Sequence, residues 1–136
     1  MQLCPHLNFS GQCEAAFKFY EQCLGGKVVT MLPYAVTPLA DQMPSQWHNK
    51  IIHATLMVGD KTLMGCDVPP ERYAEPKGIS ITLGIKDPTE AERIFNALAG
   101  NGKVSMPLQQ TFWAARFGML VDQFGIPWMI NCEQAA

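Results

Sequence analysis

The chain has 136 residues, of which 48% are hydrophobic and 16% are charged, with a formal net charge of −2 at pH 7. This length suits one compact domain or two small halves that share a core, and the lack of a basic stripe argues against nucleic-acid binding. The charged fraction is below the roughly 25% of ordinary globular domains, so we expect surface to be buried in a homodimer as well.

The first half of the chain predicts a strand, a helix and three further strands. Residues 2–9 alternate as an edge strand, because Pro5 lacks an N–H. A helix over about 12–24 should pack through a stripe that includes Phe19 and Leu24. The remaining elements are a strand at 27–33, a long loop at 34–49 that contains Trp47, and a hairpin of strands at 50–58 and 61–67.

The second half predicts the same order of elements. After a proline-rich linker and a strand at 78–85, Asp87-Pro88 marks a helix start, with Asp as the cap and Pro at the first position. Apolar residues then recur at helical spacing, and strands are expected near 103–108, 111–121 and 126–132.

The two halves also repeat one another in sequence. Glu14-Ala15 recurs as Glu90-Ala91 and Gly26-Lys27-Val28 recurs as Gly102-Lys103-Val104, each 76 positions later. We therefore expect an α+β fold of two βαβββ modules with the helices outside, which form a cleft-shaped half-open barrel. The predicted bounds are module one at 1–68, a linker at 69–77 and module two at 78–136.

The cysteines indicate the compartment. The sequence has five cysteines, and none of them shows CxxC or CxxH spacing. We find neither a signal segment nor an apolar run of about 18 residues, the length of a membrane helix. These features predict a cytoplasmic protein with reduced thiols and no membrane helix. The cysteines are Cys4, Cys13, Cys23, Cys66 and Cys132.

Two blocks carry a resemblance to a known family. Thr111-Phe112-Trp113-Ala114-Ala115 and the stretch 122–131, DQFGIPWMIN, resemble the PhnB-like branch of the vicinal oxygen chelate superfamily, which includes glyoxalase I, bleomycin-resistance proteins and extradiol dioxygenases. Phe9, Gly11 and His53-Ala54 agree with it. The resemblance implies paired βαβββ modules around a cleft, usually in a dimer. Members are often labelled demethylubiquinone methyltransferases, but no glycine-rich loop after an opening strand supports that chemistry here.

The same resemblance implies where a metal would bind. Metal-dependent members place ligands, typically His and Glu, on the first and last strand of each module, which correspond here to Cys4, Met64, Ser80 and Met129. Two thioethers, a thiol and a hydroxyl are poor ligands for a hard divalent ion, so we expect no metal and no cofactor. A displaced set of His6, His53 and Asp67 is the alternative, although strand parity turns Asp67 away from Met64 and Cys66.

The candidate site residues are therefore those of a small-molecule groove. His6 and His53 are the candidate general bases, because histidine titrates near neutral pH. Asp122 and Gly125 are interpreted as a structural turn before the last strand. Trp113 suits a flat ligand, and Arg116 suits a carboxylate or a phosphate. Strand parity places these two side chains on opposite faces of the sheet. The predicted ligand-binding residues are Asn8, Met64, Cys66, Trp113, Arg116, Met129 and Asn131.

Three functional hypotheses follow. The first is a PhnB-like protein that binds a small organic ligand in an apolar groove without the usual metal, with or without turnover. The second is a metal-dependent glyoxalase- or dioxygenase-type lyase with a displaced ligand set. The third is sequestration of a planar drug, as in bleomycin-resistance proteins, which Trp47 in the long loop favours. The sequence leaves open the ligand, its turnover, and whether the modules pair within or across chains.

Overall fold

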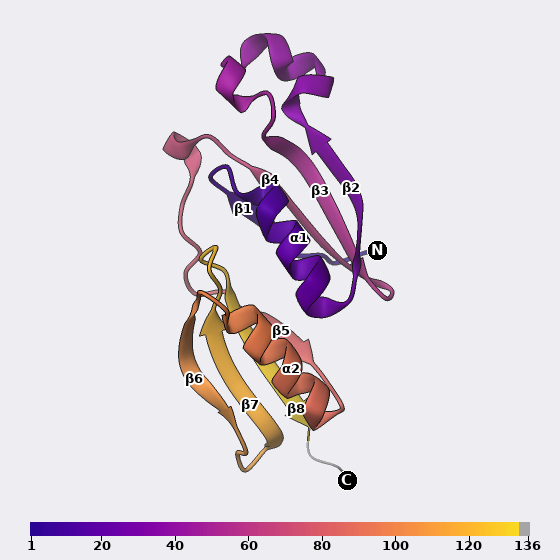
Figure 1. Cartoon of the computed structure of the whole chain (residues 1–136), viewed down its shortest axis with the longest axis vertical. Helices are drawn as coiled ribbons and strands as arrows, with labels where there is room; N and C mark the ends of the chain where they lie inside the picture. Colours follow the sequence, from indigo (N-terminus) through magenta and orange to yellow (C-terminus); the bar gives the residue numbers. More distant parts are fainter. Residues whose placement is uncertain (134–136) are drawn as a thin grey trace. The chain divides into compact units, whose positions relative to one another are not determined.

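The structure is a computed structural model that describes residues 1–133. It divides into two compact units, Met1–Ala74 and Glu75–Ala136, and the division falls inside the predicted linker. Each unit holds one four-stranded sheet and one α-helix (Figure 1). No helix within residues 1–133 is both long enough and apolar enough to span a bilayer.

In module one, the sheet has the strand order β1-β4-β3-β2, with β1 parallel to β4 and the other pairs antiparallel. The core lies between this sheet and α1, where the rings of Phe9 and Phe17 meet edge to face at 6.3 Å. The elements are β1 (His6–Phe9), α1 (Cys13–Leu24), β2 (Lys27–Pro33), β3 (Ile51–Val58) and β4 (Lys61–Asp67), with four 3₁₀ turns at Tyr34–Val36, Pro38–Gln42, Ser45–Trp47 and Pro70–Arg72.

Module two repeats this topology, with the strand order β5-β8-β7-β6. Its helix carries a buried stripe of Ala91, Ile94, Phe95 and Leu98, and Asp87 caps the helix by accepting a hydrogen bond from the Thr89 N–H. The predicted start of this helix is therefore confirmed. The elements are β5 (Ile81–Gly84), α2 (Pro88–Ala99), β6 (Lys103–Gln109), β7 (Ala114–Val121) and β8 (Pro127–Glu133).

The repeated glycines have the same physical cause in both modules. A Cβ on Gly26 would lie 2.5 Å from the Met57 carbonyl oxygen, and one on Gly102 would lie 2.5 Å from that of Val121. Each glycine therefore lets the chain leave its helix in contact with the backbone of the third strand. Because the element order and the strand pairing also repeat, the predicted α+β two-module fold is confirmed.

Three predicted boundaries were wrong at strand starts. β1 begins at His6, and Leu3 is 96% exposed, because the Pro5 position cannot donate to a ladder. β5 begins at Ile81 and leaves Ile79 exposed. β7 begins at Ala114, because the Thr111 Oγ1 accepts a hydrogen bond from the Ala114 N–H and closes a turn there.

The predicted apolar stripe of the first helix was also partly wrong. The fully buried aromatics of α1 are Phe17 and Tyr20, whereas Phe19 and Leu24 are only half-buried. The ring of Phe17 fills the space over Gly65 of β4, where a Cβ would come within 2.7 Å of it. The absence of a side chain in β4 thus decides which aromatic packs.

Candidate functional site

The face of the module-one sheet opposite α1 brings together most of the predicted site residues. Side chains alternate between the two faces of a sheet along each strand. The buried Leu7, Phe9, Leu63 and Asp67 point towards α1, so the residues next to them in sequence point to the opposite face. In the sheet register, His6 pairs with Met64 and Asn8 pairs with Cys66, while Met64 also pairs with Thr55. We use the term face opposite α1 for the surface formed by seven side chains of this sheet: His6, Asn8, His53, Thr55, Thr62, Met64 and Cys66.

Three of these residues form a chain of hydrogen bonds. The Cys66 Sγ donates to the Asn8 Oδ1 at 3.4 Å and lies 3.3 Å from the His6 Nε2. A thiol has one proton and can donate to only one of these two neighbours; the arrangement in which Cys66 donates to Asn8 puts a proton on the His6 Nε2. The His6 Nδ1 is then an acceptor and the Asn8 amide group is a donor, both on exposed residues.

The electrostatic environment favours the neutral forms of His6 and Cys66. Partial burial and then the nearby His53 lower the pKa of His6, whereas burial and then the charge of Asp67 raise the pKa of the Cys66 thiol. His53 in turn lies 3.1 Å from the Thr55 hydroxyl through its Nε2. A neutral thiol beside a neutral imidazole is not an activated nucleophile, but the imidazole can accept a proton at neutral pH.

Asp67 belongs to the opposite side of the same sheet. It is 1% exposed, and its carboxylate accepts hydrogen bonds from the backbone N–H groups of Gly11, Cys13 and Ile51, each at 2.9 Å. The predicted parity of Asp67 is therefore confirmed. Both carboxylate oxygens accept backbone hydrogen bonds on the α1 side of the sheet, so the structure does not bring Asp67 together with His6 and His53.

In module two, the face opposite α2 carries Met129 and Asn131. Met129 pairs with Thr82 and Met119, and Asn131 pairs with Gly84 and Phe117. The Asn131 Oδ1 is buried and accepts no hydrogen bond within residues 1–133. A buried acceptor without a donor costs free energy, which a ligand N–H or O–H could recover.

Trp113 and Arg116 lie apart from each other. The Trp113 ring stacks edge to face on Phe112 at 4.7 Å and on Phe117 at 5.3 Å. Both contacts of the Trp113 ring follow from the turn before β7, which the Thr111 Oγ1 closes by accepting from the Ala114 N–H. The Arg116 Nε donates to the Glu92 Oε1 of α2 at 3.2 Å, which places Arg116 on the helix side of the sheet.

Asp122 is structural, as predicted. Its Oδ1 accepts hydrogen bonds from the N–H groups of Phe124 and Ile126, and its Oδ2 accepts one from the Trp128 indole at 2.9 Å. Gly125 adopts a φ of 87° in the same turn. This cluster closes the turn before β8 and leaves Asp122 buried.

The donors on the first and last strands do not fit the metal that the fold suggests. Cys4 and Ser80 precede β1 and β5, so the residues that pair with Met64 and Met129 are His6 and Thr82. Their side chains offer one imidazole, one hydroxyl and two thioethers, whereas a hard divalent ion prefers carboxylate and imidazole. Within residues 1–133, no group of three or more His, Cys, Asp or Glu side chains could hold a metal ion.

Comparison with known proteins agrees with this fold. The sequence profile of the family described as 3-demethylubiquinone-9 3-methyltransferase matches residues 1–131. The chain belongs to this PhnB-like family. Protein YjdN of Escherichia coli is 34% identical, and the alignment covers 96% of this chain and 95% of YjdN.

Solved structures of similar proteins extend the comparison. Protein PA1353 from Pseudomonas aeruginosa is 49% identical with a TM-score of 0.90, and the match covers 99% of both chains. A putative 3-demethylubiquinone-9 3-methyltransferase, PhnB protein, from Bacillus cereus is 23% identical with a TM-score of 0.82, covering 97% of this chain and 99% of that one. At 14% identity and a TM-score of 0.61, the bleomycin-binding protein of Streptomyces verticillus shares the fold alone, over 98% of this chain and 97% of its own. The predicted resemblance to the vicinal oxygen chelate superfamily is confirmed.

Two polar members of the face opposite α1, Thr55 and Thr62, were not predicted. Thr55 contacts His53, and Thr62 accepts a hydrogen bond from Gln2 at 3.3 Å and donates one to the Met57 sulfur. Strand parity could have found both, because Thr55 lies two positions from His53 and Thr62 lies two positions from Met64.

Proposed function

We propose that this PhnB-like protein binds a small organic molecule on the face opposite α1 and does so without the metal of the wider superfamily. The main support for this proposal is the series of hydrogen bonds that links His6, Cys66 and Asn8. It presents an acceptor at the His6 Nδ1 and donors at the Asn8 amide, with the adaptable Met64 side chain beside His6. A ligand with both a donor and an acceptor on an apolar body would match this surface.

We also propose a contact with a ligand on the face opposite α2 in module two. There the unsatisfied Asn131 Oδ1 is suited to a ligand donor, and Met129 supplies apolar surface beside Thr82. In any turnover, His6 would be the general base, because its lowered pKa leaves it neutral near pH 7, and His53 would be the second candidate.

We further infer that this chain does not carry the methyl transfer named in its family's description. The turn after β1 has one glycine, Gly11, whose neighbourhood is filled by the Lys50 side chain. Such a turn does not resemble the glycine-rich loops that hold nucleotide cofactors. Calorimetric titration with S-adenosylmethionine should give no heat of binding, and saturable binding would contradict the inference.

Binding to the face opposite α1 can be tested with a ligand screen. We expect at least one class of small polar aromatic or carboxylic compounds to raise the melting temperature of the wild-type protein, and Asn8→Ala and His53→Ala to weaken that response. Lys18→Ala is the matched control, because Lys18 forms only an exposed ion pair with Glu14 on α1. A screen without any stabilising compound, or equal binding by all variants, would contradict the proposal.

Metal analysis tests the second part of the proposal. Protein purified without a chelator should contain far less than one equivalent of any divalent metal, and His6→Ala should leave that content unchanged. A full equivalent that His6→Ala removes would show that a metal binds through this face.

Homodimer formation and a cytoplasmic location are also parts of the proposal. Exposed apolar side chains support an interface, among them Phe112 at 91% and Trp113 at 48% exposure. All five cysteines are free thiols, which suits a reducing compartment. Light scattering during size-exclusion chromatography should give twice the 15.1 kDa chain mass; a monomer mass at micromolar concentration would contradict the dimer.

A further inference from the structure

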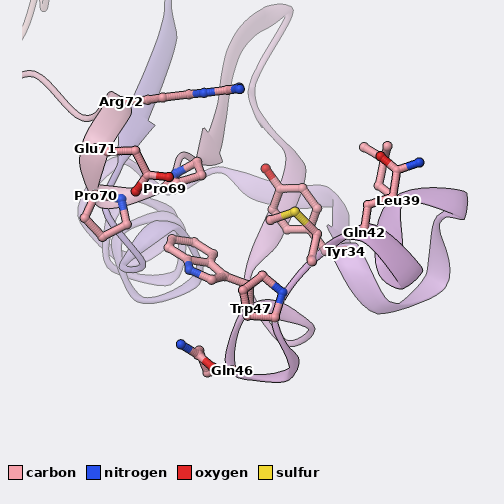
Figure 2. Close-up of a pocket in the computed structure, with 11 residues that line it drawn as sticks. Tyr34, Leu39, Gln42, Gln46, Trp47, Pro69, Pro70, Glu71 and Arg72 are labelled. Carbon is pink, nitrogen blue, oxygen red and sulfur yellow. The ribbon is translucent and has the colours of Figure 1, made fainter.

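A recess in the unit Met1–Ala74 lies between the 34–49 segment and the turn at 69–72. Its volume is about 650 Å³, within the range of small-molecule pockets. Figure 2 shows the Trp47 indole below Pro69, with Tyr34 to its upper right and Arg72 extended across the upper edge. None of the residues of the face opposite α1 lines this recess, so it is a different site from the one proposed above.

The long segment that forms one wall is held in place by its own hydrogen bonds. The His48 Nε2 lies 2.9 Å from the Ala40 carbonyl oxygen and 3.2 Å from that of Met43, so this nitrogen carries a proton and donates to both. The Ala35 N–H donates to the His48 carbonyl at 2.9 Å. The segment is therefore shaped before a ligand arrives, which lowers the entropy cost of binding.

The aromatic and proline side chains that line the recess are also held in place. The Tyr34 hydroxyl donates to the Asp67 carbonyl at 2.9 Å, and its ring meets the Trp47 ring edge to face, with centroids 6.5 Å apart. Pro69 and Pro70 contribute rigid apolar surface. Two aromatic rings and two prolines form a surface on which a flat ring can pack with little loss of side-chain entropy.

The charges at the rim select the polar group of the ligand. The Arg72 guanidinium forms no hydrogen bond or ion pair within residues 1–133, although it lines the recess. A planar guanidinium matches a carboxylate through two parallel hydrogen bonds. Glu71 also lines the recess, and its negative charge disfavours a ligand with a second negative group.

From these observations we propose that the recess binds a planar aromatic monocarboxylate, with its ring against Trp47 and its carboxylate on Arg72. The Trp47 indole then reports occupancy directly, because it lies in the wall. Trp113 and Trp128, the two other indoles of the chain, do not line the recess.

The test uses three probes of matched shape: naphthoate, naphthamide and naphthylmethylammonium. Each is titrated into the full-length protein while the indole N–H signals are followed by NMR, with the Trp47 signal assigned from Trp47→Phe. We expect naphthoate to shift the Trp47 signal saturably, and the neutral amide to bind about tenfold more weakly because it loses a charge-assisted hydrogen bond. No shift by any probe, or stronger binding of the ammonium, would overturn the proposal.

Variants assign the site. Arg72→Gln should weaken naphthoate binding about tenfold and leave naphthamide binding unchanged. The control Arg93→Gln replaces an arginine of α2 that pairs with Glu90 and does not line the recess, so it should leave naphthoate binding unchanged. The spectrum of each variant shows whether it folds. Asn8→Ala should not change the Trp47 response, which separates this proposal from the one for the face opposite α1. A response abolished by Asn8→Ala, or retained in full by Arg72→Gln, would overturn the assignment.

Discussion

The Asp67 carboxylate, at the end of β4, accepts a hydrogen bond from the backbone N–H of Cys13, the first residue of α1, at 2.9 Å. The same side chain binds the N–H groups of Gly11 and of Ile51, the first residue of β3. One buried side chain thus joins two strands to the beginning of a helix. The side chain of Gln12, the residue at the cap position of α1, does not cap this helix within residues 1–133.

Replacement of Asp67 should therefore destabilise the protein strongly. Asp67→Ala leaves three backbone N–H groups without an acceptor, and we expect a loss of about 3 kcal/mol or more in the free energy of unfolding. Urea unfolding followed by circular dichroism measures it. The control Asp60→Ala, in the exposed turn between β3 and β4, should stay close to the wild-type midpoint; an equally small effect at Asp67 would contradict this reading.

The repeated glycines provide a second test. Gly26→Ala and Gly102→Ala each place a Cβ against a backbone carbonyl that cannot move aside, so we expect each to cost about 1–3 kcal/mol. Gly84→Ala is the matched control, because a Cβ there meets no atom within 4 Å. Unfolding midpoints of the three variants decide the matter. Similar losses in Gly84→Ala and Gly26→Ala would show that close contact with the carbonyl is not the cause, because Gly→Ala by itself lowers the entropy of the unfolded chain and favours folding.

The raised pKa of Cys66 predicts a slow thiol. Burial and the charge of Asp67 disfavour the thiolate, so we expect slow alkylation of Cys66 by iodoacetamide at pH 7, measured by mass spectrometry of peptides. His6→Gln should change that rate little, because the neutral imidazole does not stabilise a thiolate. Rapid labelling that His6→Gln slows strongly would instead reveal a thiolate–imidazolium pair and a nucleophilic role.

His6 should make stability depend on pH in one direction. Its pKa is lowered on folding from 6.5 by partial burial and then by His53, so the folded protein binds fewer protons than the unfolded chain as the solution becomes acidic. The contribution of His6 is complete above pH 6.5 and is lost as the pH falls through the lowered pKa.

Unfolding midpoints measured from neutral pH downward test this dependence. The decline should be shallower in His6→Gln than in the wild type, while Asn8→Ala, which removes a neighbour on the same strand but no titrating group, should retain the wild-type slope. Identical slopes in His6→Gln and the wild type would contradict the assignment to His6.

Local chemistry in the sequence was sufficient for several elements. Asp87-Pro88 defines the start of α2, because a cap and a fixed φ act within one turn. The Asp122 turn and the repeated Gly-Lys-Val segments were equally legible. In each case the residues that interact are near in sequence or recur in the second module, so pattern alone determines the fold class.

Tertiary structure alone decided the rest. The cap of α1 is Asp67, which lies 54 positions from Cys13, and Phe17 replaces Phe19 in the core because Gly65 leaves room for it. The recess between Trp47 and Arg72, and the contact of Cys66 with both His6 and Asn8, depend likewise on strand pairing and on a loop that closes over a distant turn. Such contacts join residues far apart in the chain, and no local pattern of hydrophobicity or turn chemistry encodes which distant partner a side chain will meet.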